Sequence, residues 1–417
     1  MTRPKEIPFS IPFIDQKEIN EVVHVLRGKW ITSGPEVTKF ERKVQAYLGV
    51  STAVAVSSAT AALEICLAVH GVGPGDDVLT TAYTFASTAI VIVHRGASPV
   101  LVDVETDTFN LDPVKIEEFI RDHYVWTDQG LRSPQTGHLL RGILPVHFGG
   151  QAAEMDRINA IAQRFNLFVV EDAAHAIGAV YRGTKIGKSP NLVCFSFYSN
   201  KNLTTGEGGM IVTDNQALEQ KLRMYALHGI SKSAVERYKT GLPLYDIVYP
   251  GYKANLTDIQ AALGVVQIQK LDRITRLRNQ AARWYDAFLK TDRLQTPVIR
   301  DHNYSARHLY PILLSPELKP FRDDMILQLR KKRIYPSIHF IPVHFHSFFN
   351  GFFKEQLNAS PLHLPVTEDL FYREISLPLF PDLTKDDVKV VSDALKGIID
   401  RLIKKHRPGK GGTIPAC

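Results

Sequence analysis

The sequence places an aspartate at the end of one apolar run and a lysine shortly after another. Asp172 follows the run Phe168-Val-Val170. Lys201 follows the apolar run 193–198 and precedes a glycine-rich turn. A carboxylate at the end of a buried strand is costly without a partner, so it invites a cationic ligand group. A lysine that loses hydration has a lowered pKa and a more nucleophilic amine. Taken singly, each residue is equally compatible with a structural role, as an N-capping aspartate or a solvated surface lysine.

A third feature is the small, hydroxyl-bearing segment that follows the predicted strand 53–56. Ser58, Ala59 and Thr60 open a predicted helix at this point. Free backbone N–H groups and the helix dipole make such a junction suitable for binding a phosphate. A plain N-cap by Ser58 or Thr60 is the alternative, and on this feature alone it is the better one.

Together these features meet the needs of pyridoxal phosphate (PLP). That cofactor requires a Schiff-base lysine, a carboxylate that keeps its pyridine nitrogen protonated, and a phosphate cup. Lys201 and Asp172 would supply the first two, because one predicted strand separates them and adjacent strand ends can present both groups to one ring. A stacked aromatic ring also helps to fix the cofactor. Tyr83 and Phe85 could provide it, although most such rings belong to the core.

The elements that must position these residues are predicted as crossover units. Short β-branched apolar runs alternate with longer helical patterns through the first half of the chain, which is typical of a mostly parallel α/β sheet. Such sheets bind ligands beyond the carboxyl ends of their strands. The predicted strands are 53–56, 77–80, 99–103, 142–148, 167–171, 192–197 and 210–213, and the predicted helices are 61–70, 84–94, 113–121 and 155–165.

The sequence changes character after Pro250. Thr257 and Asp258 open a long helical pattern that continues towards Tyr285, and it predicts a connector to a smaller C-terminal α+β domain. We expect a large cofactor-binding α/β domain with an N-terminal arm over 1–255. The connecting helix and small domain are expected over 256–405, and a flexible tail over 406–417. Within the small domain the patterns predict a strand over 308–314 and helices over 322–332 and 385–402. In the large domain, the segment 124–140 is expected to be a surface excursion.

Composition excludes several classes of protein. The 417 residues are 44% hydrophobic and 22% charged, as in an ordinary globular protein. No run approaches the ~18 apolar residues of a membrane span, and the N-terminus lacks the apolar core of a secretion signal. Three widely spaced cysteines predict neither a disulfide framework nor a zinc site, so we expect a cytoplasmic protein. The net charge of +7 favours an anionic ligand but is modest for a nucleic-acid binder, and we expect no nucleic-acid or membrane partner.

Familiar ligand motifs are weak in this chain. The glycines of 71–75 follow a helix pattern and precede a strand pattern, the reverse of a dinucleotide-binding context, so a turn is expected. The segment 183–189 has one residue too few between its glycines for a P-loop. His339, His344 and His346 are close in sequence. On an extended chain, however, His344 and His346 share a face that His339 does not, and no convincing third ligand follows them. We therefore expect no metal.

At these residues the sequence resembles the DegT/StrS family of PLP-dependent sugar aminotransferases, which share the aspartate-aminotransferase (fold type I) architecture. The resemblance runs from about residue 7 to residue 402. It is carried by Trp30-Ile-Thr32-Ser33-Gly34-Pro35, Ser58-Ala-Thr-Ala-Ala-Leu63, Val146-His-Phe-Gly-Gly150, Glu171-Asp-Ala-Ala-His-Ala176, Ser196-Phe197 with Lys201-Asn202, Gly206-Glu-Gly-Gly209, Pro250-Gly-Tyr-Lys-Ala-Asn255, Asp258-Ile-Gln-Ala-Ala-Leu-Gly264 and Leu377-Pro-Leu-Phe-Pro381.

The resemblance implies a role for each matching residue. Lys201 would be the Schiff-base lysine and would also move the proton between cofactor and substrate carbons. Asp172 would pair with the pyridinium nitrogen, and His175, where many members have glutamine, would lie near the phenolic oxygen. At the phosphate the implied contacts are Ser58, Ala59, Thr60 and Ser196. Phe85 would stack on the ring, with Tyr83 as the weaker choice. Lys253 would reach the phosphate of a neighbouring subunit, which implies a homodimer with shared active sites.

The substrate implied is a keto sugar on a nucleotide carrier, with L-glutamate as amino donor. Lys253 and Asn255 stand where many members have asparagine and arginine, a variant that resembles the subgroup acting on UDP-linked 4-keto sugars. Further substrate-contact candidates are Thr32, Tyr83, Arg237, Lys239 and His339. Three alternatives stay open: another keto sugar or a keto-cyclitol as acceptor, a PLP-fold regulator or binding protein without turnover, and a nucleotide-sugar oxidoreductase, against which the missing dinucleotide motif speaks.

Overall fold

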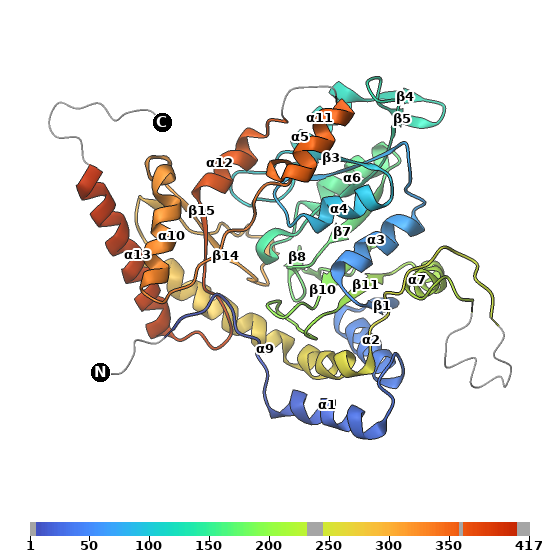
Figure 1. The fold of residues 1–417 in the computed structure, drawn as a ribbon, viewed down its shortest axis with the longest axis horizontal. Helices are drawn as coiled ribbons and strands as arrows, with labels where there is room; N and C mark the ends of the chain where they lie inside the picture. Colours follow the sequence, from blue (N-terminus) through green and yellow to red (C-terminus); the bar gives the residue numbers. More distant parts are fainter. Residues whose placement is uncertain (1–5, 232–244, 358–361, 407–417) are drawn as a thin grey trace.

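A large mixed sheet forms the centre of the computed structural model, which describes residues 6–231, 245–357 and 362–406 (Figure 1). Its main path follows the order β1-β11-β10-β7-β6-β2-β3. Neighbours from β10 to β3 are parallel, whereas β11 runs antiparallel to both β10 and β1. The strands are β1 (Thr52–Val56), β2 (Asp76–Thr81), β3 (Ser98–Val102), β6 (Leu139–Leu144), β7 (Phe168–Asp172), β10 (Leu192–Ser196) and β11 (Gly209–Thr213).

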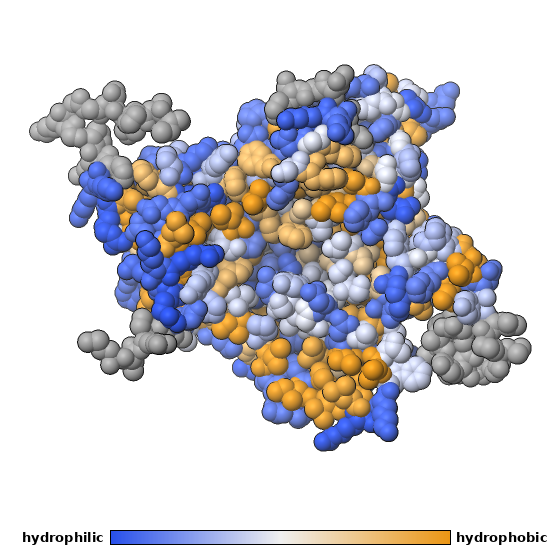
Figure 2. All heavy atoms as spheres, in the orientation of Figure 1, coloured by the Kyte–Doolittle hydropathy of each residue, from blue (hydrophilic) through white to orange (hydrophobic). Residues whose placement is uncertain are grey.

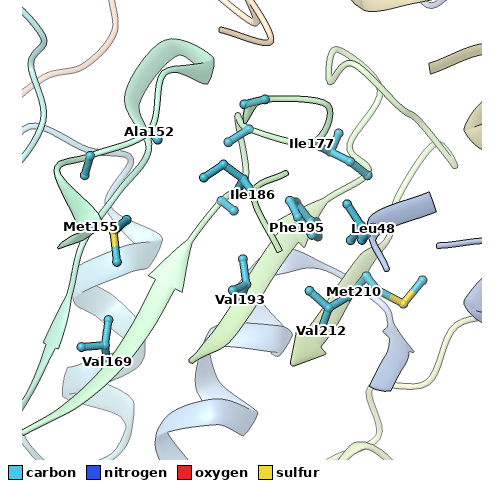
Figure 3. Close-up of a cluster of buried hydrophobic side chains, with 14 of the residues drawn as sticks. Leu48, Ala152, Met155, Val169, Ile177, Ile186, Val193, Phe195, Met210 and Val212 are labelled. Carbon is cyan, nitrogen blue, oxygen red and sulfur yellow. The ribbon is translucent and has the colours of Figure 1, made fainter. Parts of the chain in front are cut away.

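Helices cover both faces of this sheet, so its strands are buried on both sides, as parallel sheets require. On one face Val193, Phe195 and Met210 pack with Leu48, as Figure 3 shows. The alternate residues Leu192 and Cys194 pack on the other face. The first face carries α2 (Pro35–Leu48), α5 (Pro113–His123) and α6 (Met155–Arg164), and the second carries α3 (Ala59–Val69), α4 (Ser87–His94) and α7 (Glu219–Ala226).

One long helix, α9 (Asp258–Phe288), joins the sheet to the C-terminal part of the chain. Thr257 begins it with a capping box, in which its hydroxyl accepts from the Gln260 N–H and the Gln260 side chain accepts from the Thr257 N–H. The first half of α9 packs on α1 (Gln16–Gly28) and α2, and its second half contributes Ala281, Ala282 and Tyr285 to a separate core.

That separate core is the centre of an α+β region. The antiparallel sheet β12-β14-β15 lies there with the two helices α10 and α13. The remaining elements are β12 (Leu294–Gln295), β14 (Tyr310–Leu314), β15 (Glu374–Leu377), α10 (Arg322–Lys331), α11 (Ser347–Leu357), α12 (Pro365–Arg373) and α13 (Lys385–His406), together with a small sheet of β8 (Val180–Tyr181), β9 (Thr184–Lys185) and β13 (Asn303–Tyr304).

The predicted fold class is confirmed: a mostly parallel sheet is flanked by helices and followed by a smaller α+β region. The predicted strand 142–148 is shifted, because β6 begins at Leu139 and ends at Leu144. The segment 124–140, expected to be a surface excursion, holds the hairpin of β4 (Val125–Thr127) and β5 (Gly130–Arg132) and the start of β6. Helices α1 and α2 were not predicted at all, although Asp15 and Pro35 are typical helix-start residues. The domain boundaries stay a prediction.

Among the described residues, no helix combines the length and apolarity that a bilayer crossing demands.

Candidate active site

Three strand ends that carry predicted site residues meet at one edge of the sheet. Asp172 ends β7 and Ser196 ends β10, its parallel neighbour. The register then pairs Ser196 with Gly209 of β11, and Gly209 with Val56, which ends β1. Ser58 follows β1 and therefore lies at the same edge as Asp172. This is the carboxyl-terminal edge at which α/β sheets bind their ligands.

Gly209 lets the start of α3 approach the sheet closely. A Cβ atom at this position would lie 2.5–2.7 Å from backbone atoms of Ser58 and Ala59. Ser58 caps α3, because its side chain accepts from the Ala61 N–H at 3.0 Å. The N–H groups of Ala59 and Thr60 belong to the first turn and have no acceptor within the helix. Donors, hydroxyls and the positive end of a helix thus form a cup suited to a phosphate.

Asp172 is buried without a cation in hydrogen-bond contact among the described residues. Its carboxylate accepts from the Thr88 hydroxyl at 2.9 Å and from the Ala174 N–H at 3.1 Å. Burial raises the pKa of Asp172, while these two hydrogen bonds and the charge of Lys201 act in the opposite direction. A cationic group placed beside this carboxylate would therefore be strongly favoured.

Lys201 lies half-buried in the turn after β10, close enough to Asp172 for their charges to interact. Its pKa is lowered to about 8, chiefly by burial and also by the charge of Arg278, while the charge of Asp172 acts in the opposite direction. Its Nζ atom lies 3.3 Å from Nε2 of His308. An amine whose pKa lies near neutrality can act both as a nucleophile and as a carrier of protons.

His175 joins this group through the segment after β7. Its Nδ1 accepts from the Gly149 N–H at 3.3 Å, so the proton of the neutral ring is on Nε2. Burial holds the pKa of His175 well below its usual value, and the charge of Lys201 adds to this effect. Its ring lies 4.4 Å from that of His308 and 5.8 Å from that of Phe340. The arrangement presents a neutral Nε2–H donor.

Two residues beside Lys201 were not predicted from the sequence. His308 precedes β14, and burial holds its pKa well below the usual value. Arg278, on α9, is fully buried and donates to carbonyl oxygens of His308 at 3.2 Å, Leu379 at 3.0 Å and Asn200 at 3.5 Å. It thereby ties the lysine turn to two distant segments. A buried arginine in a long amphipathic helix carries no local signal of that role.

The other predicted residues divide between the site and its surroundings. Phe85 is 63% exposed, with its ring 6.1 Å from that of Phe340, so it is free to stack on a ligand. Tyr83 has no exposed surface and packs on Phe109 and Phe148, so the structure places it in the core. Its burial disfavours the expected contact with substrate, which stays a prediction.

Thr32 and Lys253 are exposed, on segments that are neighbours in space. The Thr32 carbonyl accepts from the Asp258 N–H at 3.2 Å, and the Lys253 ammonium donates to Asn255. The Asn255 amide in turn donates to the Ser33 hydroxyl at 2.6 Å. Two substrate candidates, Arg237 and Lys239, lie outside the described residues.

The histidines considered for a metal are held by different partners. Nδ1 of His339 lies 2.8 Å from the Ser376 hydroxyl, and Nε2 of His344 lies 3.3 Å from Glu368. The described residues contain no group of three or more His, Cys, Asp or Glu side chains arranged to hold a metal ion.

The residues at this edge fit pyridoxal phosphate. A buried carboxylate that accepts no hydrogen bond from a described cation matches a protonated pyridine nitrogen, and the close approach at Gly209 shapes a phosphate cup at the start of α3. Lys201 supplies an amine of lowered pKa, and Phe85 an exposed ring. These features come from different strands and agree on one ligand.

Residues 12–396 match the model of the DegT/DnrJ/EryC1/StrS aminotransferase family. The chain belongs to this family. It is 42% identical over 398 residues to the spore coat polysaccharide biosynthesis protein SpsC of Bacillus subtilis, covering 94% of this chain and 97% of that protein. Among solved structures, the putative sugar aminotransferase Spr1654 from Streptococcus pneumoniae in its PMP form is 31% identical, with a TM-score of 0.84 over 95% of this chain and 100% of that one. PseC of Helicobacter pylori, an aminotransferase of pseudoaminic acid biosynthesis, is 25% identical, with a TM-score of 0.83 over 95% and 100% of the two chains.

These matches confirm the resemblance, the fold type and the enzyme class expected from the sequence. The chain is a PLP-dependent sugar aminotransferase, and Spr1654 has also been solved in a PLP form, with a TM-score of 0.83 to this chain. The roles of individual residues at the site stay a prediction.

Proposed function

We propose that this enzyme transfers the amino group of L-glutamate to the keto carbon of a nucleotide-linked sugar, most simply a UDP-linked 4-keto-6-deoxy sugar, for the biosynthesis of a cell-surface polysaccharide. The observation that carries the chemistry is the pairing of Lys201, whose pKa falls to about 8, with the buried carboxylate of Asp172 at neighbouring strand ends. The likeness to SpsC supports the pathway. Lys253 and Asn255 support the substrate, because their types match the UDP-4-keto-sugar subgroup that the sequence resembles.

Each side chain has a defined part in this proposal. When bound, pyridoxal phosphate supplies an electron-accepting ring on which an amino group is held between the two half-reactions. Asp172 accepts the hydrogen bond of the ring nitrogen and keeps it protonated. His175 donates from Nε2–H to the phenolic oxygen, and the first turn of α3 with Ser58 and Ser196 holds the phosphate.

Proton movement falls to Lys201. Its amine removes a proton from the donor carbon and returns one to the acceptor carbon, and the reverse steps use the same group. A pKa of about 8 leaves a useful fraction of the amine unprotonated at neutral pH. Phe85 covers one face of the ring and excludes water there. Thr32, Lys253 and His339 remain as the candidates for contacts to the sugar or its diphosphate.

We further propose a homodimer with shared active sites. Large apolar side chains are exposed along the N-terminal arm and α1, and Figure 2 shows the resulting apolar patch at the bottom of the view. A patch of this kind marks an interface between proteins. Its members are Ile11, Ile14, Ile19, Val23, Leu26, Trp30 and Ile31. Lys253 is exposed and would reach the phosphate cup of the second subunit.

Mixing two inactive variants tests the shared site. Lys201→Ala and Lys253→Ala proteins, each inactive alone, should regain up to about a quarter of the activity when co-refolded, because one of the two sites in a hybrid dimer is intact. A monomer in sedimentation experiments, or no regain of activity in verified hybrids, would refute the shared site.

A cytoplasmic location is proposed from the described cysteines, since Cys66 and Cys194 are free thiols although their sulfur atoms lie 3.5 Å apart.

A visible absorption spectrum tests the chemistry. The PLP-loaded wild type should show a yellow band that bleaches with excess glutamate, whereas Lys201→Ala should not bleach. Lys185→Ala is the matched control, because Lys185 is also half-buried but donates to the Tyr47 carbonyl far from the site. Product analysis with UDP- and dTDP-linked keto sugars then identifies the acceptor. A colourless wild type would refute the proposed site, and a yellow protein indifferent to glutamate would refute the proposed donor.

A further inference from the structure

A buried carboxyl group lies behind His339 and has no part in the chemistry described above. Glu374, the first residue of β15, has no exposed surface. Its Oε1 lies 2.5 Å from the Ser376 hydroxyl, and its Oε2 accepts from the backbone N–H of His339 at 3.0 Å. The same Ser376 hydroxyl lies 2.8 Å from Nδ1 of His339. The three side chains therefore form one continuous hydrogen-bonded chain.

Such a chain has two possible proton arrangements, because the serine hydroxyl has a single proton. If Glu374 is ionised, Ser376 donates to Oε1, and His339 must donate from Nδ1, which leaves Nε2 as an acceptor. If Glu374 is protonated on Oε1, it donates to Ser376, which then donates to Nδ1, and the imidazole proton must be on Nε2. The charge state of Glu374 thus decides whether Nε2 of His339 is a donor or an acceptor.

Burial selects the protonated form of Glu374. Burial raises its pKa to about 8, against the hydrogen bonds from Ser376 and His339 and the charge of Arg322. The charge of Arg322, on α10, acts on Glu374, but its Nη1 donates to the Phe371 carbonyl and its Nε pairs with Asp323. Tyr83 also interacts with the carboxyl, and burial raises the pKa of Tyr83 well above its usual value, so it is neutral.

His339 itself stays neutral, so its tautomer is well defined. Burial lowers its pKa to about 3, and the charge of Lys201 adds to this effect. His175 and His308, the neighbouring histidines, are neutral for the same reason. Nδ1 is bonded to Ser376, and no described protein group hydrogen-bonds to Nε2. Nε2 is therefore the atom that can meet a ligand near Lys201.

We propose that Glu374 acts through Ser376 as a positioning residue for His339, holding the imidazole in the tautomer that offers Nε2–H as a hydrogen-bond donor on the substrate side. Outer hydrogen bonds fix the tautomer of an inner imidazole in just this way at other protein sites. That the acceptor is an oxygen of the keto sugar rests on the proposed function. The tautomer itself does not, because it is a property of the resting protein.

The test is NMR of protein labelled with ¹⁵N in the histidine rings, without substrate or cofactor, with the His339 signals assigned by their loss in His339→Asn. At pH 7 we expect the His339 ring of the wild type to have a protonated Nε2 and an unprotonated Nδ1. Glu374→Gln should give the same pattern, because its amide donates to Ser376 as the protonated carboxyl does. Ser376→Ala removes the donor to Nδ1 and should give a mixture of tautomers.

The internal reference is His147. Its Nδ1 accepts from the Ala153 N–H at 3.1 Å and its Nε2 lies 3.0 Å from Glu171, so its tautomer is fixed independently and should not change in any variant. Raising the pH through about 8 should ionise Glu374 and move the proton of His339 to Nδ1 in the wild type only. Glu374→Gln cannot ionise and should not switch.

Three results would overturn the proposal: a protonated Nδ1 in the wild type at pH 7, a changed tautomer in Glu374→Gln, or an unchanged one in Ser376→Ala. If Ser376→Ala does not fold, the pH switch and its absence in Glu374→Gln decide the question.

Activity gives a second readout. Loss of one neutral hydrogen bond to the acceptor, about 1 kcal/mol, predicts a roughly fivefold lower kcat/KM for the keto sugar in Ser376→Ala, with Glu374→Gln near wild type at pH 7. Failure of the proposed function would remove this readout but leave the tautomer result intact.

Discussion

Replacing Gly209 by alanine tests whether the junction of β1 and α3 is the phosphate cup. The new Cβ would lie 2.5 Å from the Ser58 carbonyl carbon and 2.7 Å from the Ala59 nitrogen. These are backbone atoms between the buried edge strand β1 and a capped helix, so they can give way only if the first turn of α3 moves away from the sheet. Overpacking of this kind costs about 1–3 kcal/mol in folding free energy, and a clash with backbone belongs at the upper end.

The displacement should weaken cofactor binding more than folding. Hydrogen bonds to a charged group contribute about 1.5–3 kcal/mol each, so misplacing one or two phosphate contacts predicts a loss of PLP affinity between roughly 10-fold and roughly 10,000-fold. Affinity would be measured by titrating the cofactor-free protein with PLP, and stability by urea unfolding of the same samples. The expected result is a large loss of affinity in a protein that still folds.

Two other glycines serve as matched controls. A Cβ at Gly264 of α9 would lie 2.6 Å from the ring of Phe40, so Gly264→Ala overpacks the core away from the site and should lower stability while leaving PLP affinity near wild type. Gly351 of α11 has nothing within 4 Å, and Gly351→Ala should stabilise the helix by up to about 1 kcal/mol. If Gly209→Ala binds PLP as tightly as Gly264→Ala does, the assignment of the phosphate to this junction is refuted.

Three further predictions concern the charged residues of the site. Asp172→Asn should remove the charge that keeps the ring nitrogen protonated and lower turnover by at least about 100-fold. Urea unfolding of the cofactor-free variant should show no loss of stability, because burial already disfavours the carboxylate. Retained turnover would contradict the role of Asp172 as the partner of the ring nitrogen. Arg278→Met should lower the free energy of unfolding by about 3 kcal/mol or more, because it leaves buried carbonyl groups without donors. Arg276→Met, on the exposed side of the same helix, is the control and should change it by no more than about 0.5 kcal/mol. Equal effects would show that the buried contacts contribute nothing. Lys201→Met should be more stable than the cofactor-free wild type at pH 7. The difference in unfolding free energy should shrink as the pH rises from about 8 towards 10.5, because over that range the unfolded lysine binds a proton that the folded lysine has lost. A difference independent of pH would contradict the lowered pKa.

The sequence alone determined the class of the fold and the kind of chemistry. Apolar runs with helical patterns between them predict a parallel sheet whatever the tertiary details, since both faces of such strands must be buried. Asp172 and Lys201 could be selected because a polar group directly after a buried strand can lie only at the edge of the sheet. The resemblance to a known family then proposed a role for each residue. Helices α1 and α2 were not predicted, because they precede the first strand of the alternating pattern, although Asp15 and Pro35 are typical helix-start residues.

Only the tertiary structure decided which residues surround the lysine and what their charges are. Tyr83 and Phe85 are two positions apart in sequence and equally aromatic, yet one is fully buried and the other 63% exposed, because packing against Phe109 and Phe148 selects between them. His308 and Arg278 come from segments far along the chain and carry no local pattern. The pKa of Lys201 depends on burial by these segments, and burial is a property of the assembled fold that no stretch of sequence contains by itself.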